Sequence, residues 1–178
     1  NVISSDLMRS GKFAPLARTQ MPQSPTTAAE ITYPVWANMG IEAIVVGHIE
    51  PAGANQYKVT FELVDVLKGK NGGADAVLDS RVATVPGKQL RQYAHRISDI
   101  VYERLTGERG AFLTRISYIS FNHGAQYPYQ LMMADYDGYN ERVLLRSREP
   151  LMSPSWSPDG RKLAYVSFEK RRASIYIQ

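Results

Sequence analysis

The spacing of apolar residues divides the chain into a part with helices and strands and a later part with strands only. At the start, Val2, Ile3, Leu7 and Met8 share one helical face, which ends near Gly11. The clearest helix is predicted for residues 88–105, where apolar side chains recur at helical spacing. After Gly110 this spacing stops, and turn residues separate short apolar runs. We therefore predict two domains, residues 1–107 and 108–178, with the boundary between residues 106 and 111.

The first domain combines these helices with three predicted strands, at residues 43–49, 56–67 and 77–85. The second strand alternates apolar and polar positions, as expected for a strand with one buried face. A short helix is predicted at residues 34–39, and the proline-containing segment 21–27 is predicted to be a linker. This order of elements predicts an α/β fold in which helices cover a small mixed sheet.

The second domain contains an internal repeat. Residues 115–121 match residues 162–168 in chemical type at each position, 47 residues apart. Residues 130–133 resemble residues 174–177 at an offset of 44, and a second hairpin shorter by three residues would explain the difference. Repeats of about 40–50 residues with several strands each are typical of β-propeller blades. We therefore predict the first blade and part of the second in residues 108–178.

The sharpest motif of the second domain is the turn from Trp156 to Gly160. Pro158 fixes φ for the first corner, Asp159 can accept hydrogen bonds from nearby backbone, and Gly160 tolerates a positive φ. Trp156 is predicted to pack between neighbouring blades. Neither Ser157 nor Asp159 has a base or an orienting partner nearby in the sequence, so we interpret this motif as structural.

A second turn contains Asp137 and Gly138 and invites comparison with a calcium-binding loop. The third oxygen ligand of an EF-hand loop is missing before Gly138, whereas an Asp-Gly hairpin turn explains the same residues. His48, His95 and His123 are not spaced as metal ligands or as part of a catalytic triad. Since nucleophile-elbow and phosphate-binding motifs are also missing, we expect no catalytic residue, no cofactor and no metal.

Composition narrows the function further. The chain has 178 residues and no cysteine, which excludes disulfides and thiol chemistry, and its net charge is +4. The densest basic run, residues 170–172, falls on a predicted hairpin turn, so we expect no nucleic-acid partner. No apolar run reaches the roughly 20 residues of a membrane span, so direct membrane insertion is not expected. The sequence opens on Asn1 without a visible signal peptide, and we expect a processed or truncated N-terminus, which is compatible with loss of an upstream secretory signal.

Several segments together resemble the TolB family of the Tol-Pal system. They are Leu-Met-Arg-Ser-Gly-Lys-Phe at 7–13, Gly-Ile-Glu-Ala-Ile-Val-Val-Gly at 40–47, Leu-Thr-Gly at 105–107, Tyr-Pro-Tyr-Gln-Leu at 127–131, Ala-Asp-Tyr-Asp-Gly-Tyr-Asn at 134–140, Pro-Leu-Met-Ser-Pro at 150–154 and Trp-Ser-Pro-Asp-Gly at 156–160. The resemblance covers essentially the whole chain. It implies an N-terminal α/β domain followed by a six-bladed propeller. The first strand of the α/β domain is then expected before Asn1, and most of the propeller after Gln178.

The resemblance also implies a function. Members of this family are periplasmic, non-enzymatic proteins that link the peptidoglycan-associated lipoprotein Pal in the outer membrane to TolA in the inner membrane. Other outer-membrane proteins are further candidate partners. The system supports outer-membrane integrity and invagination in cell division, and colicins exploit it for import. The main Pal and TolA surfaces are expected outside residues 1–178, so no partner-contacting residue is assigned.

Two other functions stay open at this point. Propeller repeats with similar turns also precede the catalytic domain of prolyl-oligopeptidase-type serine peptidases, although no Gly-x-Ser-x-Gly segment occurs in this chain. The positive net charge would also suit nucleic-acid binding, which predicts retention on DNA that weakens steeply with salt.

Overall fold

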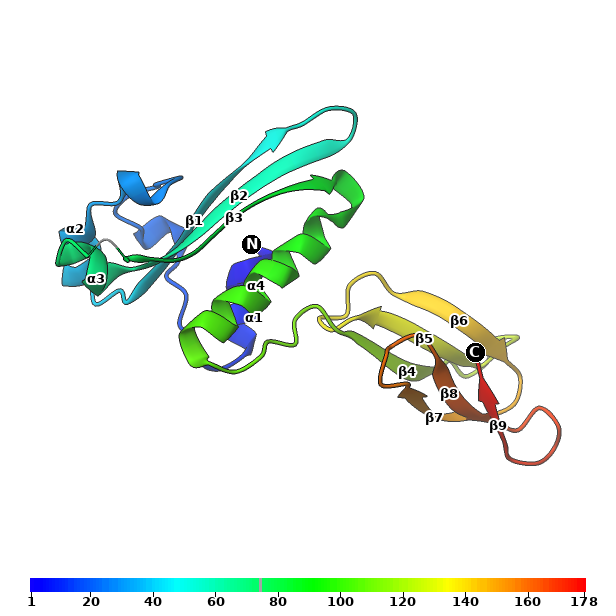
Figure 1. The fold of residues 1–178 in the computed structure, drawn as a ribbon. Helices are drawn as coiled ribbons and strands as arrows, with labels where there is room; N and C mark the ends of the chain where they lie inside the picture. The colour runs from blue at the N-terminus through cyan, green and yellow to red at the C-terminus, as the bar shows by residue number, and fades with distance from the viewer. Residues whose placement is uncertain (74) are drawn as a thin grey trace. The chain divides into compact units, whose positions relative to one another are not determined.

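The computed structural model describes residues 1–73 and 75–178, which form two compact units, Asn1–Phe112 and Leu113–Gln178 (Figure 1). Along the chain, the division between the units falls just after the predicted boundary, because Phe112 belongs to the first unit. Its ring is buried and makes an edge contact with Tyr102, at 5.7 Å between ring centroids. Its backbone N–H donates to the Asp99 carboxylate over 2.7 Å.

The first unit contains helices on a three-stranded sheet of order β1-β2-β3. Its helices and strands are α1 (Val2–Arg9), α2 (Tyr33–Asn38), β1 (Ala43–Pro51), β2 (Gln56–Asp65), α3 (Val66–Lys70), β3 (Val77–Pro86) and α4 (Leu90–Thr106), with 3-10 turns at Arg18–Gln20, Ala28–Glu30 and Gly87–Gln89. The α/β fold class is confirmed, with one correction. Both strand pairings are antiparallel, so the sheet formed by the described residues is not mixed.

The two faces of this sheet are covered by different elements. One face carries Ile44 and Val46, which join a core cluster with Trp36 of α2. The opposite face of the sheet lies against α4. Asp79 of β3 is on this side and accepts a hydrogen bond from Arg104 of α4. Ile97 and Val101 of the predicted apolar stripe are buried on α4, which begins at Leu90 rather than at residue 88. α1 packs beside α4 (Figure 1).

The predicted second strand proved too long. β2 ends at Asp65, and Val66 begins the short helix α3 instead of continuing the strand. The Asp65 carboxylate accepts a hydrogen bond from the backbone N–H of Lys68 over 2.9 Å. This side-chain cap satisfies a backbone donor that a strand would otherwise have paired, and it favours the turn into a helix.

The predicted linker 21–27 has no regular element, yet its Gln23 fixes the neighbouring chain. The Gln23 Oε1 atom accepts hydrogen bonds from the Thr32 backbone N–H and from the Trp36 indole N–H, each over 3.0 Å. Its Nε2 donates to the Thr32 hydroxyl over 2.8 Å. One amide thereby holds the segment before α2 against the buried indole.

The second unit consists of two three-stranded antiparallel sheets, β4-β5-β6 and β7-β8-β9. Their strands are β4 (Arg115–Phe121), β5 (Tyr129–Asp135), β6 (Arg142–Ser147), β7 (Leu151–Trp156), β8 (Leu163–Ser167) and β9 (Ser174–Ile177). The predicted repeat is confirmed by the strand register. Tyr118 lies opposite Met132, and Tyr165 lies opposite Tyr176, which matches the two sequence offsets of 47 and 44.

The core of the second unit lies between these sheets. Leu131 of β5 is buried together with Leu151 and Leu163 of the next sheet. Trp156 packs against this cluster as predicted, and the Arg115 guanidinium of β4 lies 5.6 Å from the centre of its ring. In the described residues, β8 has a strand on both sides, whereas β4 is paired with β5 alone.

Candidate functional site

The turn after Trp156 is organised by its own polar side chains. The Asp159 carboxylate accepts hydrogen bonds from the Ser157 hydroxyl over 2.5 Å and from the Arg161 backbone N–H over 3.1 Å. These bonds lower the pKa of Asp159, with the Ser157 bond as the larger cause. Gly160 has a φ of +66°, as the sequence predicted. Both polar side chains of the motif therefore hold the turn itself.

The turn with Asp137 and Gly138 is also held by hydrogen bonds from its own residues. Gly138 has a φ of +84°, and its backbone N–H donates to the Asp135 carbonyl over 2.9 Å. The Asp135 carboxylate accepts from the Asn140 amide over 2.7 Å, and the Asp137 carboxylate accepts from the Tyr139 backbone N–H over 3.2 Å. These contacts fit the predicted hairpin turn between β5 and β6.

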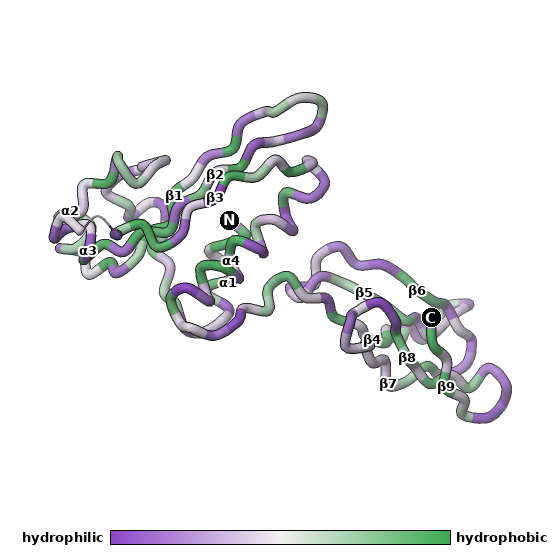
Figure 2. The backbone as a smooth tube through the Cα atoms, in the orientation of Figure 1, coloured by the Kyte–Doolittle hydropathy of each residue, from purple (hydrophilic) through white to green (hydrophobic). Residues whose placement is uncertain are grey.

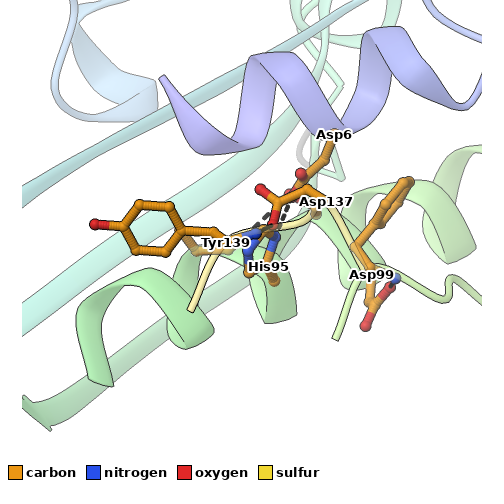
Figure 3. Close-up of polar contacts among 8 residues, drawn as sticks. Asp6, His95, Asp99, Asp137 and Tyr139 are labelled. Carbon is orange, nitrogen blue, oxygen red and sulfur yellow. Dashed lines mark hydrogen bonds and ion pairs between the residues drawn. The ribbon is translucent and has the colours of Figure 1, made fainter. Parts of the chain in front are cut away.

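A buried polar cluster joins α1 to α4. Asp6, His95 and Ser98 are each at most 1% exposed. His95 Nδ1 lies 2.8 Å from Asp6 Oδ2, and the Ser98 hydroxyl donates to the same oxygen over 2.7 Å. Figure 3 shows the Asp6 carboxylate facing the His95 ring. Because buried polar groups are costly unless they are hydrogen-bonded, this cluster fixes how the two helices pack.

The cluster has the residue types of a catalytic triad, but it does not have the geometry of one. In a triad the serine hydroxyl is bonded to the histidine, whose other nitrogen is bonded to the aspartate. Here the Ser98 hydroxyl donates to Asp6 and to the Ala94 carbonyl, at 2.7 and 3.1 Å. Ser98 is also fully buried, so a substrate cannot reach its oxygen. The arrangement is that of a structural hydrogen-bond centre.

A second polar contact joins β3 to α4. The Asp79 carboxylate accepts hydrogen bonds from Arg81 over 2.9 and 3.2 Å and from Arg104 over 2.9 Å. The bond from Arg81 is the main cause that lowers the pKa of Asp79, and burial acts against it. Asp79 therefore remains ionised in the folded unit well below neutral pH.

Sequence reasoning missed the polar cluster of Asp6, His95 and Ser98. His95 is a buried residue of α4. His48 lies on β1, 3.8 Å from Glu50, and His123 lies in the β4–β5 turn. The missed signal was a polar residue inside an apolar helical face. Asp6 precedes Leu7, and His95 and Ser98 flank Ile97.

Two further expectations for apolar side chains were wrong. Met8 was predicted to share one apolar helical face with Leu7, yet Met8 is 60% exposed, and Asp6 of the same helix is buried. Leu105, an apolar residue at the end of the predicted helix 88–105, is also exposed. None of the helices in the described part of the chain is both long enough and apolar enough to cross a membrane.

The fold and these sites define a class of protein. An α/β unit precedes repeated propeller-type blades, and the polar motifs of both units act on the protein's own packing and turns. Family models agree with this description in chain order. The TolB amino-terminal domain matches residues 1–72, and the TolB β-propeller domain matches residues 102–178.

Individual relatives give the same family. The chain is 49% identical over 177 residues to the Tol-Pal system protein TolB of Haemophilus influenzae strain 86-028NP and 48% identical over 178 residues to that of Pasteurella multocida strain Pm70. It covers 41% of the length of each. The crystal structure of TolB from Acinetobacter baumannii matches 99% of this chain with a TM-score of 0.88 and 36% identity, over 42% of its own length. The chain belongs to the TolB family.

Proposed function

We propose that this protein is a periplasmic, non-catalytic scaffold of the Tol-Pal system that links Pal of the outer membrane to TolA of the inner membrane. In this role it maintains outer-membrane integrity and supports invagination of that membrane during division. The observation that carries the proposal is the TolB domain order along the chain, joined to a blade register that repeats from one sheet to the next. The relatives' designation as Tol-Pal system proteins supports it.

The physical basis is that a scaffold needs rigid surfaces and no bond chemistry. Blades held by buried side chains and hydrogen-bonded turns supply such surfaces. The Asp6–His95–Ser98 cluster and the Asp79 contacts similarly fix the helices of the first unit. Binding on preorganised surfaces costs less conformational entropy than binding on mobile ones.

The test uses the full-length protein, purified from its native envelope with an affinity tag. We expect Pal and TolA to be recovered with it, and a tagged periplasmic protein of unrelated fold serves as the control. Failure to recover Pal under conditions that preserve a known envelope complex would contradict the proposal. The serine-peptidase alternative is tested on the same preparation with a fluorophosphonate probe, which labels activated serines. Labelling would contradict a non-catalytic role.

A further inference from the structure

A groove lies at one end of the two sheets of the second unit. It is an open groove with a volume of about 500 Å³, lined by Tyr127, Arg146, Ser147, Arg148, Glu149 and Glu169. Strand direction places the β4–β5 turn, the β6–β7 connection and the β8–β9 turn at this end. The two Asp-Gly turns lie at the opposite end. We call the groove formed by the six lining residues the arginine groove.

Hydrogen bonds from two buried serine side chains hold the backbone that lines the groove. Two serines, Ser147 and Ser167, are each only 1% exposed. The Ser147 hydroxyl donates to the Glu149 carbonyl over 2.8 Å and accepts from the Glu149 backbone N–H over 3.0 Å. The Ser167 hydroxyl accepts from the Glu169 backbone N–H over 3.3 Å. Each buried serine thereby holds the backbone of a glutamate that lines the groove.

The arginines of the groove are placed differently from its glutamates. The Arg148 guanidinium lies 5.4 Å from the centre of the exposed Tyr127 ring, in a cation–π contact. Arg146 is also exposed. Among the described residues, neither guanidinium forms an ion pair with a carboxylate. Both therefore present hydrogen-bond donors to a ligand.

The charge of the surroundings is positive. The β8–β9 turn adds Lys170, Arg171 and Arg172 next to Glu169, and Figure 2 shows this turn as a hydrophilic stretch of the tube. The groove and the adjoining turn thus carry five cationic side chains and two carboxylates, those of Glu149 and Glu169. An anionic group that approaches the groove is attracted, and electrostatic attraction of this kind speeds encounter and favours one partner over others.

We propose that the arginine groove binds an aspartate or glutamate side chain presented by a protein partner. The planar guanidinium group matches a carboxylate through two parallel hydrogen bonds, and tyrosine and arginine are the residues enriched where proteins bind one another. The groove volume is that of a site for a small group or a short peptide segment. This inference goes beyond the proposed function and does not depend on Pal or TolA being the partner.

Glu149 and Glu169 make a protein segment a better ligand for the groove than a polyanion. Phosphate-rich ligands need a broad stripe of cations, whereas Glu149 and Glu169 interrupt the positive surface at backbone positions held by Ser147 and Ser167. A protein segment can place a carboxylate on the arginines and keep a neutral or basic side chain beside the glutamates. The glutamates thereby give the groove selectivity.

The test is a titration of the full-length protein followed by NMR of the arginine Nε–H groups. The probes are acetyl-glutamate-amide and its isosteric, uncharged control, acetyl-glutamine-amide. We expect saturable shifts of the Arg146 and Arg148 signals with the glutamate probe alone. Arg148→Gln should weaken binding about tenfold, because a charge-assisted pair is lost. Tyr127→Phe should keep the affinity, whereas Tyr127→Ala should lower it by releasing Arg148. Arg161→Gln, in the turn at the opposite end, is the matched control and should have no effect.

Four results would overturn the proposal. The first is the lack of saturable shifts with the glutamate probe. The second is equal shifts with the glutamine probe, and the third is equal weakening by Arg161→Gln. The fourth is tighter binding of inorganic phosphate or of phosphatidylglycerol vesicles to the same arginines, which would make the groove a polyanion site. Arg146→Gln provides a second variant should Arg148→Gln disturb the fold. Recovery of Pal and TolA is measured separately, so the two proposals can fail independently.

Discussion

Replacing Asp79 by asparagine should loosen the attachment of α4 to β3. The substitution keeps the shape of the side chain but removes the charge that three N–H groups of Arg81 and Arg104 share. Hydrogen bonds to charged groups contribute about 1.5–3 kcal/mol each when buried. The two arginines are 42% and 54% exposed, so water replaces part of what is lost. We expect a net cost of about 2 kcal/mol, or roughly 30-fold in the opening equilibrium.

Hydrogen exchange read by mass spectrometry measures this effect in peptides from β3 and α4. Asp75→Asn is the matched control, because Asp75 is 82% exposed in its contact with Lys68 and should contribute under about 0.5 kcal/mol. If β3 and α4 exchanged at the same rate in Asp79→Asn and the unmodified protein at pH 7, Asp79 would not hold these elements together.

The same pair gives a pH dependence with a defined sign. Hydrogen bonding from Arg81 is the main cause that lowers the pKa of Asp79 in the folded unit. The resulting stabilisation is present above the unfolded pKa, about 3.9, and is lost as the pH falls through the folded pKa. The difference between the unmodified protein and Asp79→Asn should therefore be full at pH 7 and shrink below about pH 4. A difference that grew in acid would contradict the assigned charge state.

Three other substitutions test separate parts of the fold. Gly47→Ala should weaken the β1–β2 pairing by about 1–3 kcal/mol, because its Cβ would lie 2.3 Å from the Thr60 carbonyl oxygen; faster exchange in β1 and β2 would report it. Gly160→Val should lower the melting temperature of the second unit, since a φ of +66° costs a β-branched residue about 1–2 kcal/mol, and Gly160→Asn should cost less. Ile97→Asp places a charge at a position that is 4% exposed and should unfold the first unit. Near-UV circular dichroism would detect this unfolding as a loss of signal. A native spectrum would mean that the buried face of α4 is misassigned.

The sequence by itself determined the features that depend on neighbouring residues. The blade repeat followed from matching strand patterns, and the register of Tyr118 and Tyr165 agrees with it. The turns at Gly138 and Gly160 followed from local backbone requirements, and both glycines have positive φ. The burial of Ile97 and Val101 on α4 followed from helical spacing. These signals are local because they arise from the geometry of a single strand, turn or helix.

Only the tertiary structure decided which distant polar residues meet. Asp6 and His95 are 89 positions apart, and Asp79 and Arg104 are 25 apart, and no periodicity links either pair. The direction of strand pairing and the change from strand to helix at Val66 likewise depend on how elements pack together. The arginine groove combines three connections between strands. Contacts between segments distant in sequence carry no local pattern, because side-chain burial and hydrogen bonding are satisfied by whichever elements packing brings together.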